Sequence, residues 1–341
     1  MSRLTIVALN AATQDAAFNQ VRDIDPGNIE VVHAGFRSTW ANVSARRRSA
    51  AVIEQDLPDA LRSALARADV VFGFLVPTHL PDLAPQLRWL HTPATGIDHL
   101  RGTGVLESDI RITTVGSLFA PVIAEHVLAA MLYFARRLGH FEQQRRDRTW
   151  EMTRVQTLAV HTAGLVGVGN IGSHVARLAK VFGMRVIGVG RTATVARVVP
   201  AVDRLLPRSE LPALLNQSDY VVVAVADTGE TRHMIAAAEL AAMKPEAILI
   251  NVARGTVIDE PALIAALQTK RIAGAALDVF AEEPLPADSP LWDLPNVLLT
   301  PHVAANVEGY LASAIAQFAD NLRRFLSGAA LENEYDRQRG Y

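Results

Sequence analysis

The sequence has no cysteine, no strong excess of charge of either sign and no long apolar run. Without cysteine, disulfides, thiolate metal sites and cysteine nucleophiles are all excluded. The apolar runs are shorter than the roughly 18 residues that a membrane helix needs, and the opening LTIVALN is too short for a signal peptide. The net charge of −2 gives no electrostatic reason to expect binding to nucleic acid or to a membrane. We therefore expect a soluble cytoplasmic protein.

The chain does have enough apolar material for two domains. Its 341 residues exceed one ordinary domain, and half of them are hydrophobic. In the first 110 residues, short apolar runs alternate with helix-like segments such as PDALRSALARA (58–68). The candidate strands are LTIVAL (4–9), IEVVHA (29–34), DVVFGFL (69–75), LRWLHT (87–92) and DIRITTV (109–115). This alternation predicts a parallel sheet with helical crossovers.

A long helix is expected next, from Ala120 to about Arg148. Pro121 fits near its start, because the first turn of a helix has no partner for the missing N–H. Apolar residues recur at helical spacing over much of the circumference. Such a helix is typically buried, either between domains or between subunits.

A second series of strands and helices begins at residue 163. The candidate strands are AGLVGVG (163–169), RVIGVG (185–190), YVVVAV (220–225), AILINV (247–252), GAALDVF (274–280) and VLLTP (297–301). The candidate helices are 172–182, 209–216, 236–243 and 259–268, with Asp259 as the cap of the last. We expect one doubly wound domain here, and a final helix, Tyr310 to Ser327, that packs on the first domain.

The segment GVGNIG (167–172) joins an apolar strand to a helix, which is the context of a dinucleotide-binding turn. Gly167 permits the tight turn, Gly169 lets a pyrophosphate approach the backbone, and Gly172 lets the helix pack on the strand. The start of the helix, at Asn170 and Ile171, then presents free N–H groups to the phosphates. A structural turn without a ligand is the alternative.

The end of the next strand distinguishes NAD from NADP. NAD sites carry an acidic residue there, which binds the adenosine ribose. Here the strand ends in Gly190-Arg191-Thr192, and the next acidic residue is Asp203. Because no carboxylate repels a 2′-phosphate, Arg191 and Thr192 can bind one, so we expect NADPH to be preferred and NAD to be less favoured. An ordinary exposed arginine is the alternative.

Three side chains beside turn-forming Gly or Pro residues could together bind an oxo acid and give it a proton. Arg254 follows the strand AILINV, and its guanidinium can hold a carboxylate by paired bonds or simply form a salt bridge. His302 follows VLLTP and could donate the proton, or be a satisfied buried histidine. Either Glu283 or Glu282 could pair with its ring and favour the imidazolium.

Other candidates are less distinctive. Asp278 ends the strand GAALDVF and could accept a hydrogen bond from a nicotinamide carboxamide, cap a helix or join a buried salt bridge. The turn Thr95-Gly96-Ile97 could present N–H groups to a carboxylate, and the loop at Val76 could wall the site, or both could be ordinary loops. His126 lies in the long helix and is expected to be structural. The ten histidines show no metal-binding spacing, so we expect no metal.

With these motifs the chain resembles the D-isomer-specific 2-hydroxyacid dehydrogenases along nearly its whole length, from TPATGIDHL to TPHVA. The most specific segments are GLVGVGNIG, AAMKPEAILINVARGTVIDEPALIAAL, GAALDVFAEEPLP and PLWDLPNVLLTPH. The resemblance implies that Arg254 binds the substrate, that His302 is the acid/base residue and that Glu283, which precedes the proline, supports it. It places Asp278 near the carboxamide.

The resemblance also implies an α/β fold with two doubly wound parallel-sheet domains. A flavodoxin-like substrate domain would comprise residues 1–110 and 305–341, and a Rossmann domain of residues 111–304 would be inserted in it. Homodimers would form through the helix after residue 120. The pair Gly190-Arg191 is similar to that of the glyoxylate/hydroxypyruvate reductases that use NADPH.

We therefore expect an enzyme that transfers a hydride from NADPH to a small 2-oxo acid, such as glyoxylate or hydroxypyruvate, and forms the D-2-hydroxy acid. The alternative is a cofactor-sensing module that binds proteins, like the corepressor relatives of the family, with little or no turnover. Turnover of 2-oxo acids distinguishes the two.

Overall fold

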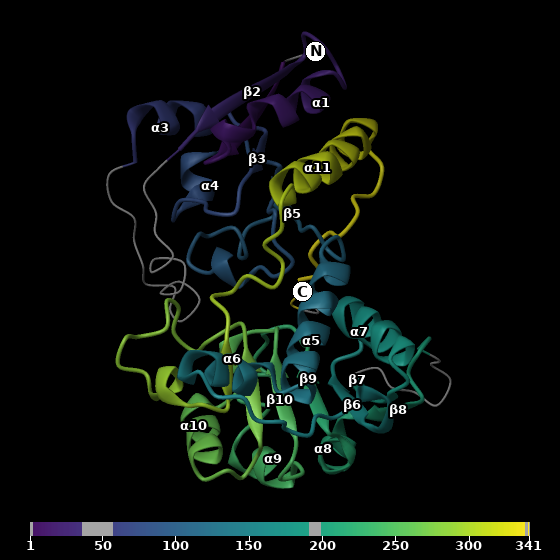
Figure 1. Ribbon diagram of the computed structural model, residues 1–341. Coiled ribbons are helices and arrows are strands. Elements are labelled where there is room, and N and C mark those ends of the chain that lie inside the picture. The colour runs from purple at the N-terminus through teal and green to yellow at the C-terminus, as the bar shows by residue number, and fades with distance from the viewer. Residues whose placement is uncertain (1–2, 36–56, 191–198, 338–339, 341) are drawn as a thin grey trace. The chain divides into compact units, whose positions relative to one another are not determined.

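The computed structural model describes residues 3–35, 57–190, 199–337 and 340. The chain divides into two compact units, one of Met1–Leu118 with Val307–Tyr341 and one of Phe119–Asn306 (Figure 1). We call them unit 1 and unit 2. The sequence-based boundary after residue 110 is too early, because the strand Arg111–Thr113 pairs with the sheet of unit 1. The second boundary lies after Asn306, close to the expected residue 304.

Unit 1 contains a parallel sheet with the strand order β2-β1-β3-β4-β5, which is the flavodoxin-like order. Its strands are β1 (Leu4–Leu9), β2 (Ile29–Ala34), β3 (Val70–Phe72), β4 (Trp89–His91) and β5 (Arg111–Thr113). Its helices are α1 (Asn19–Arg22), α3 (Asp59–Leu65), α4 (Leu80–Leu83) and α11 (Tyr310–Ser327). Every residue of β1 is buried, because helices cover both faces of a parallel sheet.

The last helix, α11, belongs to unit 1 as the sequence predicts. Its apolar residues Ile315, Phe318 and Leu322 are fully buried. They pack in one cluster with Phe72 and Trp89 from the sheet. Residues from the two ends of unit 1 therefore build a common core.

Unit 2 contains a parallel sheet of seven strands in the order β12-β11-β10-β9-β6-β7-β8. The strands are β6 (Thr162–Val166), β7 (Arg185–Gly190), β8 (Arg204–Pro207), β9 (Tyr220–Val223), β10 (Ile248–Asn251), β11 (Gly274–Leu277) and β12 (Val297–Leu299). Counted from β6, this is the Rossmann order with one further strand at the edge. The order reverses between β6 and β9, where such sheets bind ligands.

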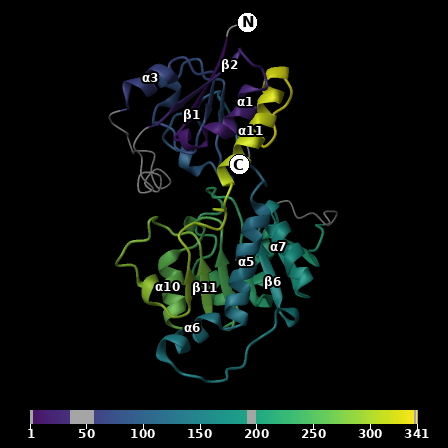
Figure 2. The ribbon, with the colours of Figure 1, turned by 45° about the horizontal axis from the view of Figure 1, so that its top comes forward.

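Helices cover both faces of the unit 2 sheet. On one face α5 (Ala120–Ala135) and α7 (Asn170–Val181) pack against β6, β7, β9 and β10 (Figure 2). On the other face lie α8 (Leu211–Gln217), α9 (Ala237–Ala242) and α10 (Glu260–Gln268). Strand residues alternate between the two apolar clusters, as the pleat requires.

The prediction of one long helix from Ala120 to about Arg148 is wrong in one respect, because the segment forms two helices. α5 ends at Ala135, and α6 (Leu138–Asp147) begins after Arg137, whose φ of 53° is left-handed. A side chain at Gly139 would overlap the hydroxyl of Tyr133, so the chain turns tightly at the break. α5 buries apolar residues, whereas α6 buries none.

None of the helices in the described part of the chain combines the length and the apolarity that crossing a membrane would take.

Candidate active site

Three neighbouring strands of unit 2 bring the predicted catalytic residues to one edge of the sheet. Arg254 follows β10, Asp278 follows β11 and His302 follows β12. These strands are parallel and adjacent, so their carboxyl ends meet. Several strands end earlier than the sequence suggested, because the last residues of AILINV, GAALDVF and VLLTP leave the sheet to form the loops of this site.

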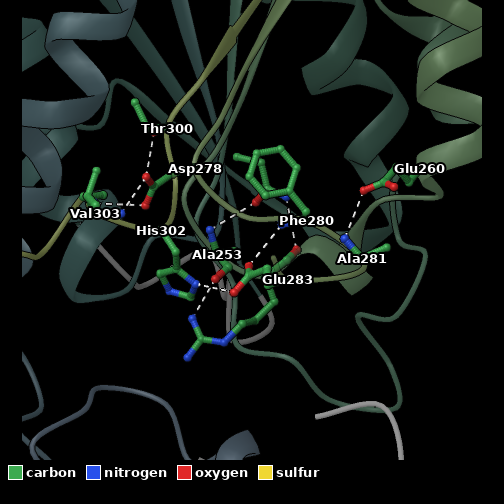
Figure 3. Close-up of polar contacts among 12 residues, drawn as sticks. Ala253, Glu260, Asp278, Phe280, Ala281, Glu283, Thr300, His302 and Val303 are labelled. Atoms are coloured by element: carbon green, nitrogen blue, oxygen red, sulfur yellow. Dashed lines mark hydrogen bonds and ion pairs between the residues drawn. The ribbon is translucent and has the colours of Figure 1, made fainter. Parts of the chain in front are cut away.

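His302 forms a hydrogen bond with Glu283. Its Nδ1 lies 2.8 Å from Glu283 Oε2 (Figure 3). The other carboxylate oxygen of Glu283, Oε1, accepts the backbone N–H of Phe280 at 3.1 Å. Glu283 is buried, whereas Glu282 is exposed. The structure thus pairs His302 with Glu283, the carboxylate that the family resemblance selects.

Arg254 lies in a turn that packs against the loop carrying Glu283. Its side chain is partly exposed, and Nη1 donates a hydrogen bond to the carbonyl oxygen of Ala253 at 2.7 Å. A Cβ on Gly255 would overlap the carbonyl group of Phe280 and the N atom of Ala281. The glycine therefore permits the contact between the turn of Arg254 and the loop that ends in Glu283.

Asp278 holds the backbone around His302. Its Oδ1 accepts the hydroxyl of Thr300 at 2.6 Å and the N–H of Val303 at 2.9 Å (Figure 3). Its Oδ2 accepts the N–H of Ala304, also at 2.9 Å. His302 itself has a left-handed φ of 56°, so its turn needs support from both sides. The sequence did not indicate this role, although Thr300 two residues before His302 was a weak signal.

His126, on α5, also contacts this hydrogen-bond chain. Its Nε2 lies 3.3 Å from the hydroxyl of Thr300, which itself donates to Asp278. The contact gives His126 a hydrogen-bond partner in the loop that follows β12.

The glycine turn has the shape that its motif requires. Gly167 has a φ of 100°, and a Cβ there would lie 2.5 Å from the carbonyl oxygen of Ala224. A Cβ on Gly172 would overlap the carbonyl oxygen of Gly167, whereas one on Gly169 would meet no described heavy atom within 4 Å. The first and third glycines thus serve packing, and the second leaves open space before α7 among the described residues.

Asn170 is exposed at the first position of α7, and Ile171 packs its partly buried side chain on the core of unit 2.

The end of β7 tolerates a side chain sterically. A Cβ on Gly190 would make only an ordinary contact, 3.8 Å from Leu205 Cδ1. Asp203, the next acidic residue, accepts the N–H of Val186 at 2.8 Å and binds Lys180 Nζ at 2.9 Å. These bonds lower the pKa of Asp203 and give it a structural role. Arg191 and Thr192 lie outside the described residues.

The predicted substrate loops both belong to unit 1. Thr95 is exposed and Gly96 and Ile97 are partly exposed, and none of their N–H groups bonds to another described residue. Val76 is fully buried in the core, so its side chain is structural. Its neighbour Leu75 instead lines a largely apolar hollow of about 140 Å³. Within the described ranges, no cluster of three or more His, Asp or Glu side chains could hold a metal ion.

A model of the NAD binding domain of D-isomer specific 2-hydroxyacid dehydrogenases matches residues 128–304, more than half of the chain. The chain belongs to this family. The matched segment contains the glycine turn and the Arg254, Glu283 and His302 positions. Unit 2 is therefore the cofactor-binding part of a D-2-hydroxyacid dehydrogenase.

Individual relatives agree with this assignment. The chain is 36% identical to glyoxylate/hydroxypyruvate reductase B of Pectobacterium carotovorum over 288 residues, covering 81% of this chain and 88% of that one. It is 34% identical to D-3-phosphoglycerate dehydrogenase of Synechocystis, but covers only 44% of that longer protein and 71% of its own length. A solved D-isomer specific 2-hydroxyacid dehydrogenase from Xanthobacter autotrophicus, in complex with NADPH and MES, is 30% identical, with a TM-score of 0.81 and 100% of both chains covered.

Proposed function

We propose that this dehydrogenase reduces small 2-oxo acids, such as glyoxylate or hydroxypyruvate, to D-2-hydroxy acids with NADPH. The observation that carries the proposal is the buried Glu283 carboxylate 2.8 Å from Nδ1 of His302, at the same sheet edge as Arg254. The reductase activity named for the Pectobacterium relative and the NADPH bound in the Xanthobacter structure support it.

The catalytic chemistry follows from these side chains. Arg254 binds the substrate carboxylate with its planar guanidinium. His302 donates a proton from Nε2 to the carbonyl oxygen, because its Nδ1 faces Glu283. Glu283 fixes the orientation of the ring through its contact with Nδ1. When bound, the nicotinamide cofactor supplies the hydride to the carbonyl carbon.

Unit 2 also offers the means to bind and select NADPH. The open space at Gly169 and the N–H groups at the start of α7 would hold the pyrophosphate. No carboxylate ends β7, so a 2′-phosphate meets no repulsion at Gly190, and we assign its binding to Arg191 and Thr192. We assign Asp278 a second contact, to the carboxamide, since its Oδ2 accepts one N–H from the described residues, that of Ala304, and an oxygen can accept two.

The test is a panel of initial rates with 2-oxo acids and both cofactors. We expect kcat/KM to be higher with NADPH than with NADH, and His302→Gln to abolish nearly all turnover while NADPH still binds. Tight NADPH binding by the wild-type protein without turnover of any 2-oxo acid would instead indicate the cofactor-sensing module.

We also propose a cytoplasmic homodimer that associates through α5 and the segment that follows it. Trp150 and Met152, just beyond α6, are 96% and 99% exposed. Large apolar side chains so exposed are typical of protein–protein interfaces. A second copy of the chain is the partner that the family resemblance implies.

A further inference from the structure

A carboxylate outside the proposed catalytic set, Glu260, reaches the loop that carries Glu283. Glu260 is the first residue of α10, directly after the cap Asp259. Its Oε2 accepts the backbone N–H of Ala281 at 2.9 Å, across 21 positions in the sequence (Figure 3). Helix-terminal glutamates usually interact with their own helix, so this long-range contact calls for a separate explanation.

The backbone at Phe280 and Ala281 connects the loop that carries Glu283 with the turn that follows Arg254. The N–H of Phe280 goes to Glu283, and the next N–H along the chain, that of Ala281, goes to Glu260. The face of the same peptide lies against Gly255, where a Cβ would overlap it. Two consecutive peptides are thus each fixed by one carboxylate, and the second of them, Phe280–Ala281, also packs against the turn that follows Arg254.

Burial and a neighbouring charge both disfavour the ionised carboxyl of Glu260. Burial raises the pKa of its carboxyl, the bond from Ala281 opposes this rise, and the charge of Glu282 adds to it. A partly buried carboxylate is destabilised unless its hydrogen bonds compensate. The hydrogen bond from the N–H of Ala281 provides this compensation. A side chain has to accept it, because the N-terminus of α10 directs N–H groups outward and no carbonyl groups.

We propose that Glu260 is a positioning residue, which holds the Phe280–Ala281 peptide so that Glu283 meets His302 and the loop stays seated beside Arg254. The inference rests on the proposed function, because it assigns Glu260 a place in the same reaction. Glu260 does not touch the substrate, and it acts through Glu283.

The test compares Glu260→Ala with Glu260→Gln. The alanine variant lacks the acceptor, and a displacement of about 1 Å at a catalytic group can lower kcat by up to roughly 100-fold. We expect Glu260→Ala to lose kcat by about tenfold or more on this basis, with NADPH affinity unchanged. Glu260→Gln should regain most of the lost kcat, because its amide oxygen can accept the same N–H.

Glu239 provides a matched control. It also lies in the first turn of its helix, α9, but its Oε2 accepts the N–H of Ala236 in the same helix start. Glu239→Ala should lower the melting temperature without lowering kcat. If Glu260→Ala kept kcat at the level of this control, or if glutamine were as poor as alanine, the positioning role would be wrong.

A second readout needs no turnover. The proton between His302 Nδ1 and Glu283 should give a downfield NMR signal, which Glu260→Ala should shift or broaden and Glu239→Ala should leave in place. If the wild-type protein turned over no 2-oxo acid but Glu260→Ala still changed this signal, the proposed function would be wrong. The positioning role of Glu260 would remain. An unchanged signal in Glu260→Ala would overturn the role itself.

Discussion

Gly190 is the residue at which one side chain should change the cofactor. Among the described residues, a Cβ there would meet only Leu205 at ordinary contact distance, and Gly190 lies in the strand β7. Gly190→Asp would place a carboxylate beside the 2′-phosphate, and like charges in contact destabilise a complex by several kcal/mol. We expect kcat/KM with NADPH to fall by about tenfold or more, which corresponds to about 1.4 kcal/mol, and kcat/KM with NADH to rise.

Gly190→Ala is the control for this change, because it adds the Cβ without the charge. It should retain the NADPH preference of the wild type. Equal loss in both variants would mean that the effect is steric and that the strand end does not select the cofactor.

His91 should make the stability of unit 1 depend on pH. Burial lowers its pKa from 6.5 to about 3, and its ring stacks on Phe72 with Nδ1 2.8 Å from the hydroxyl of Thr113. Because the folded pKa is depressed, the unfolded chain binds more protons below pH 6.5, and stability falls as the pH drops from there toward about 3. Between pH 7 and pH 5 the loss should be about 2 kcal/mol.

Urea denaturation at both pH values checks this expectation, with His91→Phe as the comparison. Phenylalanine keeps the stacking, and Thr113 keeps the bond from Trp89 Nε1 at 2.8 Å. Between pH 7 and pH 5, the free energy of unfolding of His91→Phe should fall by about 2 kcal/mol less than that of the wild type. Parallel pH profiles would show that His91 does not carry the dependence.

Sequence reasoning named residues whose own type suits the proposed chemistry, such as Arg254 and His302, and the structure brings both to one edge of the sheet. It left Glu282 and Glu283 as alternatives until the family resemblance, and the structure separates them by burial and by the contact with His302. It missed Glu260 and the hydrogen bonds by which Asp278 holds the backbone around His302. Those roles depend on backbone N–H groups that come close only after β10, β11 and β12 have paired.

At the scale of elements, segments with one uninterrupted apolar periodicity were predicted with correct bounds, whereas segments with mixed sequence were not. β1 and α11 have the bounds that their apolar periodicity indicates. β8 was missed because Arg204–Pro207 is a four-residue edge strand whose two leucines lie between an arginine and a proline. α5 and α6 were merged because helical residues continue across the break, and only the left-handed Arg137 ends the first helix.

The turn after β10 offers a test at this scale. Gly255→Ala should push the Phe280–Ala281 peptide away, since the new Cβ would overlap it. Overpacking of this kind destabilises a protein by about 1–3 kcal/mol. We also expect kcat to fall. Steady-state kinetics measure the change in kcat, and the melting temperature measures the change in stability.

Gly229→Ala is the matched control, because a Cβ there meets no described heavy atom within 4 Å. It should change neither quantity. Full activity of Gly255→Ala would mean that the loop can move without disturbing the His302–Glu283 pair.

At the scale of the whole molecule, the exposed Trp150 and Met152 predict association of two copies. Trp150→Glu should shift the protein from dimer to monomer in sedimentation, because a charge at an apolar interface opposes its burial. Val181→Glu is the control, since Val181 is 80% exposed at the end of α7. A monomeric wild type, or dimers in both variants, would rule out this interface.

The placement of α11 in unit 1 also has a consequence for synthesis on the ribosome. The core around Trp89 needs Phe318 and Leu322, which are made only after all of Phe119–Asn306. At about 5–20 residues per second, the first five strands wait on the order of ten seconds or more for their covering helix. Unit 2 can acquire its core in that interval, so the unit begun first should be the one completed last.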